Sequence, residues 1–378
     1  MNFSDLEALI DTMPQRGIPF FDLRVAQNGE EIYRHGAGCT DEAGKKSLSD
    51  EDLYWLFSTS KVITCTGAMR LVERGRLCLE DPVSKYLPAF GDLTVRQADG
   101  TVIPAKTPLT VAHLFTMTSG IGSDTHQSQV VQDAIALEGA STREIVDSFA
   151  KVPLFFEPGT HYRYGYSHDV LAAVVEQVSE MRFSEYIKRE ILDPLEMHDT
   201  GFRPNEDQKK RFAAMHRYCV AGGTSVSKPT VNEFVFTPNY DSGGAGLFSC
   251  AGDYIKFVAA LSNNGVANNG YRLLMPETIA KMEQNRLNDT ALGDFVTGRL
   301  HGYGWGLCGR VHINPVYSLS RSPIGEFGWD GAGGCFAMVD RKNRLGIFYG
   351  MQVRACSYSY IILQPLIRSM VYKALEIE

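Results

Sequence analysis

The sequence Phe-Ser-Thr-Ser-Lys at residues 57–61 places a hydroxyl and an amine three positions apart. Apolar residues recur at helical spacing through 52–75 and Gly75 supplies a stop signal, so we predict a buried helix with Ser58 near its first turn. Residues at positions i and i+3 lie on one helical face, so the amine of Lys61 can reach the hydroxyl of Ser58. Because a serine hydroxyl is a poor nucleophile until a base accepts its proton, the pair predicts an activated serine.

This motif occurs twice in the chain. Ser225 and Lys228 form a second copy, but Pro229 follows it and the surrounding residues 219–241 are predicted to be irregular. The second pair is therefore not expected to share a helical face. For the first pair, the alternative is a helix-capping serine beside a solvated lysine, and the local sequence leaves both interpretations open.

Composition indicates one compact globular body. Of 378 residues, 44% are hydrophobic and 21% are charged, and no linker-like stretch divides them. The net charge of -7 comes without a cluster of Lys or Arg, so nucleic acid is not an expected partner. The N-terminus lacks the features of a signal peptide and no apolar run approaches about 18 residues, so we expect a cytoplasmic protein without a membrane span. The oligomeric state stays open.

Cysteines and histidines do not form metal-binding patterns. No Cys-x-x-Cys pair and no His-Glu-x-x-His motif is present, so we expect no metal and no cofactor. The cysteines are predicted to be reduced and buried. They are Cys39, Cys65, Cys78, Cys219, Cys250, Cys308, Cys335 and Cys356.

Helices and strands are predicted from periodicity and from turn residues. Asn28-Gly29 is a strong hairpin signal between two strand-like segments. The expected strands are 19–27, 31–36, 304–313, 326–329, 335–339 and 345–353. The expected helices are 3–15, 52–75, 109–117, 141–150, 168–179, 183–192, 251–263, 276–285 and 357–375.

This order of elements predicts an α/β (α+β) fold. The N-terminal hairpin and the C-terminal strands are expected to form one antiparallel sheet flanked by helices. We therefore predict a discontinuous sheet domain, formed by 1–76 and 235–378, and an inserted, mostly helical lobe at 77–234. The active site is expected between them.

Longer motifs identify a family resemblance. The segments 56–61 and 71–83 closely resemble the serine β-lactamase and penicillin-binding-protein superfamily. They are most similar to its class C-like branch, which includes family VIII carboxylesterases and lovastatin-type acyltransferases. Further landmarks follow in the expected order over nearly the whole chain, at 109–120, 157–160, Tyr164, 273–278 and 328–331. The resemblance implies a β-lactamase/transpeptidase-like fold.

The family's second motif, Tyr-x-Asn, is altered in this chain. After Pro158-Gly159 the sequence has Tyr164 and Tyr166, with no Asn at the third position. The resemblance implies that Tyr164 is the catalytic tyrosine that shares a proton with Lys61, and that Tyr166 binds substrate in place of the amide. The alternative is that Tyr162, Tyr164 and Tyr166 form one aromatic face in a core.

The third motif, Lys-Thr-Gly, is replaced by Trp329-Asp330-Gly331, which is similar to the Trp-Gly-Gly of the esterases. Without the lysine, the cation that anchors a β-lactam carboxylate is missing, which favours a neutral, apolar acyl ester. Gly331 permits close backbone approach. The resemblance implies that the amides of Ser58 and Ala332 form the oxyanion hole. Trp329, Asp330 and Gly331 are predicted to bind substrate, although Asp330 has the alternative of a solvated turn carboxylate.

The resemblance thus predicts a serine carboxylesterase that forms an acyl-enzyme at Ser58 and passes the acyl group to water or to an alcohol. The expected partner is a small-molecule ester. The alternatives are a β-lactamase or D-amino-acid peptidase/amidase on the same fold, and a non-catalytic binding protein.

Other motifs are given structural interpretations. We expect His113 to be a capping or core residue and His168 to lie at the surface. The glycines at 243–246 lack the context of a phosphate loop, and no Gly-x-Ser-x-Gly elbow occurs. The walls of the pocket are expected from the helical lobe and the loop 121–135.

Overall fold

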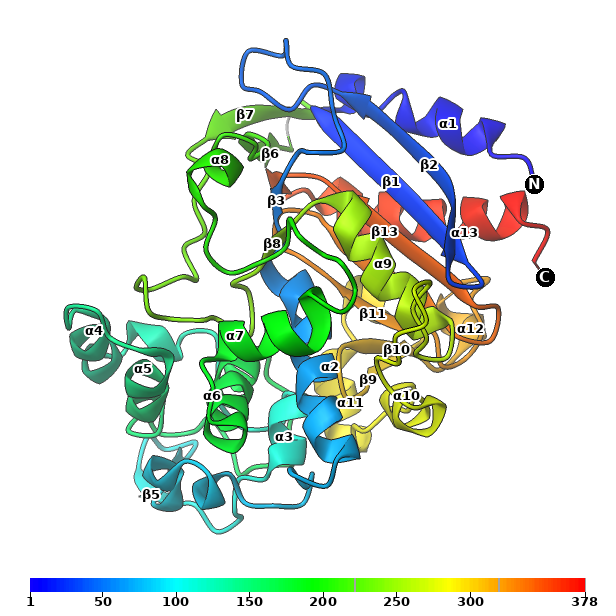
Figure 1. Cartoon of the computed structure of the whole chain (residues 1–378). Coiled ribbons are helices and arrows are strands. Elements are labelled where there is room, and N and C mark those ends of the chain that lie inside the picture. The colour runs from blue at the N-terminus through cyan, green and yellow to red at the C-terminus, as the bar shows by residue number, and fades with distance from the viewer. Residues whose placement is uncertain (221, 319, 378) are drawn as a thin grey trace.

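A computed structural model describes residues 1–220, 222–318 and 320–377. Its main feature is a seven-stranded antiparallel sheet in the order β2-β1-β13-β12-β11-β10-β9 (Figure 1). The strands are β1 (Phe20–Gln27), β2 (Glu30–Gly38), β9 (Tyr303–Trp305), β10 (Arg310–His312), β11 (Phe327–Asp330), β12 (Phe336–Asp340) and β13 (Leu345–Gly350). The predicted pairing of the N-terminal hairpin with C-terminal strands is confirmed by β1 and β13.

The hairpin between β1 and β2 turns at Asn28 and Gly29. Both residues have positive φ, 56° and 87°, as a type I′ turn requires. The pairing register shifts between Val25 and Ala26, which produces a bulge near the turn. The fold prediction from Asn28-Gly29 is therefore confirmed in detail.

Helices cover both faces of this sheet (Figure 1). On one face α1 (Ser4–Ile10) and α13 (Gln364–Ala374) bury alternate residues of β1, such as Leu23 and Val25. On the other face lie α9 (Ala251–Ser262) and α2 (Ser60–Glu73). The sheet thus separates two apolar cores.

The middle of the chain is mostly helical. Its helices are α3 (Val111–Phe115), α4 (Gln129–Ile135), α5 (Thr142–Phe149), α6 (Ser167–Ser179), α7 (Phe183–Ile187) and α8 (Glu206–Lys209). Short strands accompany them: β4 (Thr94–Arg96), β5 (Val102–Pro104), β6 (Met215–Cys219) and β7 (Thr224–Lys228). In Figure 1 the helices α3 to α7 lie below the sheet, whereas α8, β6 and β7 lie beside the sheet. The division into two lobes at residues 77 and 234 stays a prediction.

The remaining elements lie in the C-terminal half, apart from β3 (Tyr54–Trp55), which pairs with β8 (Phe248–Ser249). They are α10 (Pro276–Met282), α11 (Asp289–Phe295), α12 (Pro315–Ser318) and β14 (Val353–Arg354). No helix in the three described ranges combines the length and the apolar character that crossing a bilayer needs.

Several predicted boundaries were wrong because tertiary pairing overrides local pattern. The segment 52–75 is not one helix: it begins as β3, continues through a 3-10 turn at Phe57–Thr59, and becomes helical only at Ser60. The segment 304–313 is a hairpin of β9 and β10. Residues 219–241 were predicted to be irregular, but β7 pairs there with β6. The predicted helices 183–192 and 357–375 each contain a π-helical turn.

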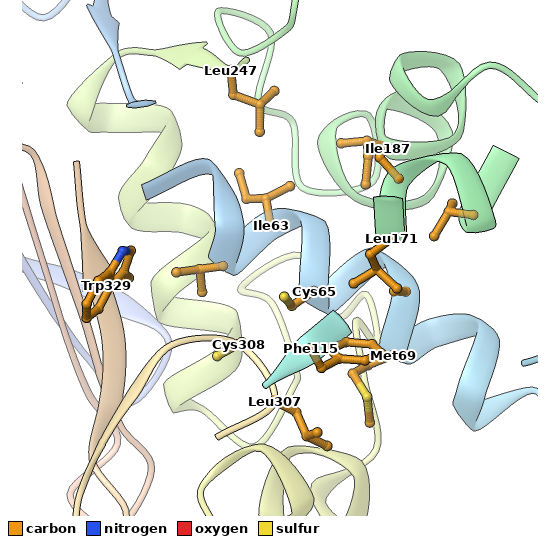
Figure 2. Close-up of a cluster of buried hydrophobic side chains, with 14 of the residues drawn as sticks. Ile63, Cys65, Met69, Phe115, Leu171, Ile187, Leu247, Leu307, Cys308 and Trp329 are labelled. Carbon is orange, nitrogen blue, oxygen red and sulfur yellow. The ribbon is translucent and has the colours of Figure 1, made fainter. Parts of the chain in front are cut away.

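Helix α2 is the central element of the larger core. Every residue from Ser60 to Leu71 is buried, which confirms a buried helix in this region. Figure 2 shows its side chains Ile63, Cys65 and Met69 among residues from other elements, including Phe115, Leu171, Ile187, Leu247, Leu307, Cys308 and Trp329. Residues from many segments therefore pack around α2.

The cysteines are all free, and five of the eight are buried. Cys78 is exposed, and Cys39 and Cys219 are partly exposed. The prediction of buried thiols was therefore wrong for these three, none of which belongs to either apolar core.

Candidate active site

Ser58 lies in the 3-10 turn between β3 and α2. The preceding residue, Phe57, has a φ of 47°, a left-handed conformation that non-glycine residues rarely adopt. Its buried ring packs edge-on against Phe234 and lies 4.7 Å from the Arg354 guanidinium. Such a conformation costs on the order of 1 kcal/mol and persists only where packing imposes it. The sharp turn directs the chain from the strand into the helix at the candidate nucleophile.

Lys61, in the first turn of α2, has only 3% of its surface exposed. Its Nζ donates hydrogen bonds to Ser58 Oγ at 3.3 Å and to the carbonyl oxygen of Gly244 at 2.7 Å. It also lies 4.7 Å from the centre of the Tyr164 ring. The structure thus brings together the three residues predicted as the catalytic set.

A glycine-rich loop, residues 241–246, forms the floor beneath Lys61. Besides the Gly244 carbonyl, the carbonyl of Gly243 accepts a hydrogen bond from Thr64 Oγ1 at 2.6 Å. A Cβ on Gly244 would lie 2.6 Å from Asp169 Oδ2 and 3.3 Å from Lys61 Nζ, so no larger residue fits without displacement. Sequence reasoning considered this loop only as a phosphate-binding loop and did not predict that it binds Lys61. The run of glycines after Asp241-Ser242 is the sequence feature that could have indicated a close approach of this loop to another element.

Asp169, on α6, is a second residue that sequence reasoning missed. Its Oδ1 accepts hydrogen bonds from Tyr240 Oη at 2.8 Å and from Ser242 Oγ at 2.6 Å. Burial raises the pKa of Asp169, opposed by the hydrogen bond from Ser242 and by the positive charge of Lys61. A buried carboxyl group therefore holds the glycine-rich loop through the hydroxyl of Ser242.

The sequence prediction is confirmed for His113 and wrong for His168. His113 Nδ1 accepts a hydrogen bond from the amide of Thr110 at 3.1 Å within a capping box, which confirms the capping interpretation. His168 was predicted at the surface, but it is fully buried beside α2, and its Nε2 bonds to the Phe115 carbonyl at 3.1 Å. Burial, with the charge of Lys61, lowers the pKa of His168 to about 3, so the ring is neutral at neutral pH.

Tyr164 is oriented by Trp329 from β11. The Trp329 Nε1 donates a hydrogen bond to Tyr164 Oη at 3.0 Å. With this bond accepted, the phenol still has its own proton to donate. Tyr162 and Tyr164 both pack against Trp305, with ring centroids 5.6 and 6.1 Å away. Tyr166 packs elsewhere, against Phe149 and Phe236, so the three tyrosines do not form one aromatic face.

A cavity of about 470 Å³ opens beside Ser58. Its walls come from Tyr164 and from the C-terminal third of the chain, and none comes from the predicted loop 121–135. Tyr164 belongs to the segment predicted as the helical lobe, so only the prediction for the loop was wrong; part of that loop is α4, which packs against α5. The lining residues are Ser58, Tyr164, Arg299, Trp329, Asp330, Ala332, Ser357, Tyr360 and Ile361.

Some of the predicted substrate-binding and oxyanion-hole residues line the cavity. Trp329 and Asp330 line the cavity, as does Ala332, whose amide stays a predicted oxyanion donor. A Cβ on Gly331 would lie 2.1 Å from the carbonyl oxygen of Leu56, so the close approach requires glycine there.

The structure disagrees with the substrate-binding prediction for Tyr166 and with the alternative of a solvated turn carboxylate for Asp330. Tyr166 is 5% exposed and packs against Phe149 and Phe236, and it is not among the residues that line this cavity. Asp330 is not a solvated turn residue: it ends β11, is 7% exposed, and pairs with Arg299. Strand pairing of β11 with β12 buries this carboxylate, which local sequence could not show.

The second Ser-x-x-Lys copy has no such geometry. Ser225 and Lys228 both lie on β7, where residues three positions apart point to opposite faces. No group of three or more His, Cys, Asp or Glu side chains in 1–220, 222–318 and 320–377 is arranged to hold a metal ion.

Known proteins resemble this chain in sequence and in fold. A model of the beta-lactamase family matches residues 6–354. Esterase EstB of Burkholderia gladioli is 30% identical over 345 residues, which is 85% of this chain and 83% of the esterase. Acyltransferase calJ of Penicillium decumbens is 28% identical over 361 residues, covering 88% of this chain and 83% of the relative.

A solved structure titled EstCE1, a hydrolase with promiscuous acyltransferase activity, superposes with a TM-score of 0.82 at 23% identity and covers 98% of both chains. That likeness shows the fold, and the family model spans most of the sequence. The chain therefore belongs to the beta-lactamase family.

Proposed function

We propose that the protein is a serine carboxylesterase that forms an acyl-enzyme at Ser58, from which water or an alcohol takes the acyl group. The observation that carries this proposal is the 3.3 Å hydrogen bond between Lys61 Nζ and Ser58 Oγ at the wall of a cavity that Tyr164 also lines. The 30% identity to an esterase over most of both chains supports the choice of substrate.

In the acylation step, Ser58 Oγ forms a bond to the ester carbonyl carbon, and its proton passes to the pair formed by Lys61 and Tyr164. The carbonyl π electrons move to the oxygen, where the amides of Ser58 and Ala332 donate hydrogen bonds to the negative charge. When the tetrahedral intermediate collapses, the bond to the alcohol oxygen breaks. That oxygen takes a proton from Tyr164 and leaves as the alcohol.

Deacylation runs through the same groups in reverse. Water or an acceptor alcohol gives a proton to the Lys61–Tyr164 pair and attacks the acyl carbon. Ser58 Oγ leaves and recovers a proton from the same pair. The products are a carboxylic acid with water, or a new ester with an alcohol, and Ser58 is restored in both cases.

The cavity favours esters over β-lactams. Trp329 presents an indole where the family's third motif places a lysine, and its N–H is used by Tyr164. Tyr360 and Ile361 add further apolar surface to the same wall. A neutral acyl chain can bury against these side chains, whereas the carboxylate of a β-lactam would lack that lysine.

The test measures hydrolysis of p-nitrophenyl butyrate by the wild type, Ser58→Ala, Lys61→Ala and Tyr164→Phe. We expect Ser58→Ala to lower kcat by about 1000-fold or more, because nucleophile and base act as a unit. Ser225→Ala is the matched control, since it removes the serine of the second motif copy, and it should keep wild-type activity. A fluorophosphonate probe should label Ser58 in the wild type, as mass spectrometry would show.

Retention of wild-type turnover by Ser58→Ala would contradict the proposal. A kcat/KM for nitrocefin above that for simple esters would point to a β-lactamase instead. A protein that neither turns over esters nor is labelled at Ser58 would be a binding protein on this fold.

A further inference from the structure

The cavity wall carries two opposite charges that face one another. The guanidinium of Arg299 lies 2.6 Å from Asp330 Oδ2, and both residues line the cavity that contains Ser58. The Asp330 side chain is 9% exposed and that of Arg299 is 23% exposed. The resemblance to known hydrolases assigns no role to Arg299, and Asp330 is an unusual residue in its motif.

This ion pair differs from the structural ion pair next to it. Arg310 and Glu326 are fully buried and form two parallel hydrogen bonds, at 2.9 and 2.8 Å. In contrast, Arg299 Nη1 and Asp330 Oδ2 lie 2.6 Å apart without two parallel hydrogen bonds, and the Arg299 side chain is partly exposed. Desolvation offsets much of the attraction within a buried ion pair, so this contact is weak evidence that Asp330 serves stability alone.

Arg299 is held in place without Asp330. Its Nη1 donates a hydrogen bond to Gln364 Oε1 at 3.1 Å. Its guanidinium also lies 5.0 Å from the centre of the Tyr360 ring, and Tyr360 Oη is itself anchored by a 2.9 Å bond to the Gly331 carbonyl. Removing the charge of Asp330 would therefore leave a cation at the cavity wall with its position kept.

The Arg299–Asp330 ion pair affects which substrates the cavity can bind. An unpaired guanidinium in a cavity of this size would bind a carboxylate, which matches its fork of donors. Asp330 already occupies that position, and its negative charge repels a second anion. The wall is thus neutral as a whole, although it contains a full positive charge.

We propose that Asp330 is a specificity-determining residue that excludes acyl groups carrying a carboxylate, and that Arg299 becomes a carboxylate-binding residue when Asp330 is replaced by an uncharged residue. This inference rests on the proposed esterase function for its kinetic test. It names the substrate class as esters of uncharged acids, and it attributes that choice to one side chain.

The experiment compares kcat/KM for p-nitrophenyl butyrate with that for mono-p-nitrophenyl glutarate, which carries a free carboxylate. The variants are Asp330→Asn, Asp330→Ser, Arg299→Gln and the double variant Asp330→Asn/Arg299→Gln. We expect the ratio of glutarate to butyrate activity to rise roughly tenfold or more in both Asp330 variants. The ratio should return to the wild-type value or below in the double variant, and the gain should shrink in 0.5 M NaCl because added salt screens charges.

Glu283→Gln is the matched control. Glu283 forms a bidentate pair with Arg341 and is not among the residues that line this cavity, so its loss should leave the ratio unchanged. An unchanged ratio in the Asp330 variants, or an equal rise in Glu283→Gln, would overturn the inference.

Binding of glutarate, measured by calorimetry, separates this inference from the proposed function. We expect glutarate to bind Asp330→Asn at least tenfold more tightly than it binds the wild type or the double variant. This result can hold even if no ester is hydrolysed, in which case only the esterase proposal fails. Equal binding by the wild type and Asp330→Asn, or binding by neither, would refute the role of Asp330.

Discussion

At the residue scale, the chemistry of Ser58 depends on side chains that its own motif does not contain. Lys61 Nζ is held by Ser58 Oγ and the Gly244 carbonyl, and the Tyr164 oxygen is held by the indole of Trp329. The contact of Lys61 with Gly244 joins residues 183 positions apart, and the contact of Trp329 with Tyr164 joins residues 165 positions apart. The buried neighbours His168 and Asp169 then set the electrostatic surroundings, one neutral ring and one carboxyl with a raised pKa.

His168 gives this site a dependence of stability on pH. Its pKa is about 3 in the folded protein and about 6.5 in an unfolded chain. Between these two pH values the imidazole is therefore protonated in the unfolded state and neutral in the folded state. The stability is therefore fully present above pH 6.5 and is lost as pH falls toward 3. Between pH 7.5 and 5, we expect the wild type to lose about 2 kcal/mol more unfolding free energy than His168→Gln.

Urea unfolding at both pH values measures this difference. Asp169 contributes in the opposite sense because its pKa is raised, but it is present in both proteins and largely cancels in the comparison. Parallel pH profiles for the two proteins would show that His168 is accessible to protons in the folded state.

At the element scale, helix α2 and the loop 241–246 together form the base of the site. The helix supplies Lys61, and the loop supplies the Gly244 carbonyl that binds it. The loop can approach this closely because Gly243 and Gly244 have no side chains; a Cβ on Gly243 would lie 2.3 Å from the His168 carbonyl oxygen. Packing of the loop against α6 therefore decides where the lysine points.

Gly244→Ala tests this dependence on the loop. The added methyl group would lie 2.6 Å from Asp169 Oδ2 and 3.3 Å from Lys61 Nζ, so the loop or the amine must move. We expect kcat/KM for p-nitrophenyl butyrate to fall roughly tenfold or more, since misplaced catalytic groups lose rate steeply.

The control for this prediction is Gly252→Ala in α9, where a Cβ meets no atom within 4 Å. That variant should keep its activity and gain about 0.5–1 kcal/mol in unfolding free energy. If Gly244→Ala were as active as Gly252→Ala, the loop would not position the lysine.

At the scale of the whole molecule, a buried charge network joins α2 to two other parts of the chain. Glu190, in the π-helical turn Lys188–Leu192, accepts hydrogen bonds from Arg70 at 3.0 Å and from Arg74 at 2.7 Å. Arg70 also donates to the carbonyl of Leu273, so the network reaches the C-terminal half. Burial disfavours the charge of Glu190, but the hydrogen bonds from Arg74 and Arg70 outweigh it and lower its pKa to about 2.

Glu190→Gln is expected to lower the free energy of unfolding by about 2–4 kcal/mol at pH 7, because Arg70 would remain buried without its partner charge. The contribution of Glu190 is present above its unfolded pKa near 4.5 and is lost as pH falls toward 2, so the two proteins should converge in acid. Urea unfolding measures both effects.

Glu206→Gln is the matched control, since Glu206 is 83% exposed and forms only a surface pair with Lys209. It should change stability by less than about 0.5 kcal/mol. Equal effects of the two substitutions would mean that the network does not tie the molecule together.

Local pattern accounts for much of the fold. Turn residues and apolar periodicity act over a few neighbouring positions, and they predict three parts of the fold. These parts are the hairpin at Asn28-Gly29, the buried segment containing Cys65 and Met69, and the strands β11, β12 and β13. The pattern failed where pairing with a distant segment decided the structure. Tyr54 and Trp55 form a strand because β8 lies beside them, and the second Ser-x-x-Lys copy became part of β7 because β6 pairs with it.

The sequence by itself determined the family, part of the order of the elements and the candidate residues Ser58, Lys61 and Tyr164, because ordered motifs and local periodicity are properties of the chain. Only the tertiary structure decided that the loop 241–246 supports the lysine and that Asp330 faces Arg299 across the cavity wall. These contacts join residues 183 positions apart in the first case. Their geometry follows from how the buried helix and the sheet pack, which no local signal specifies.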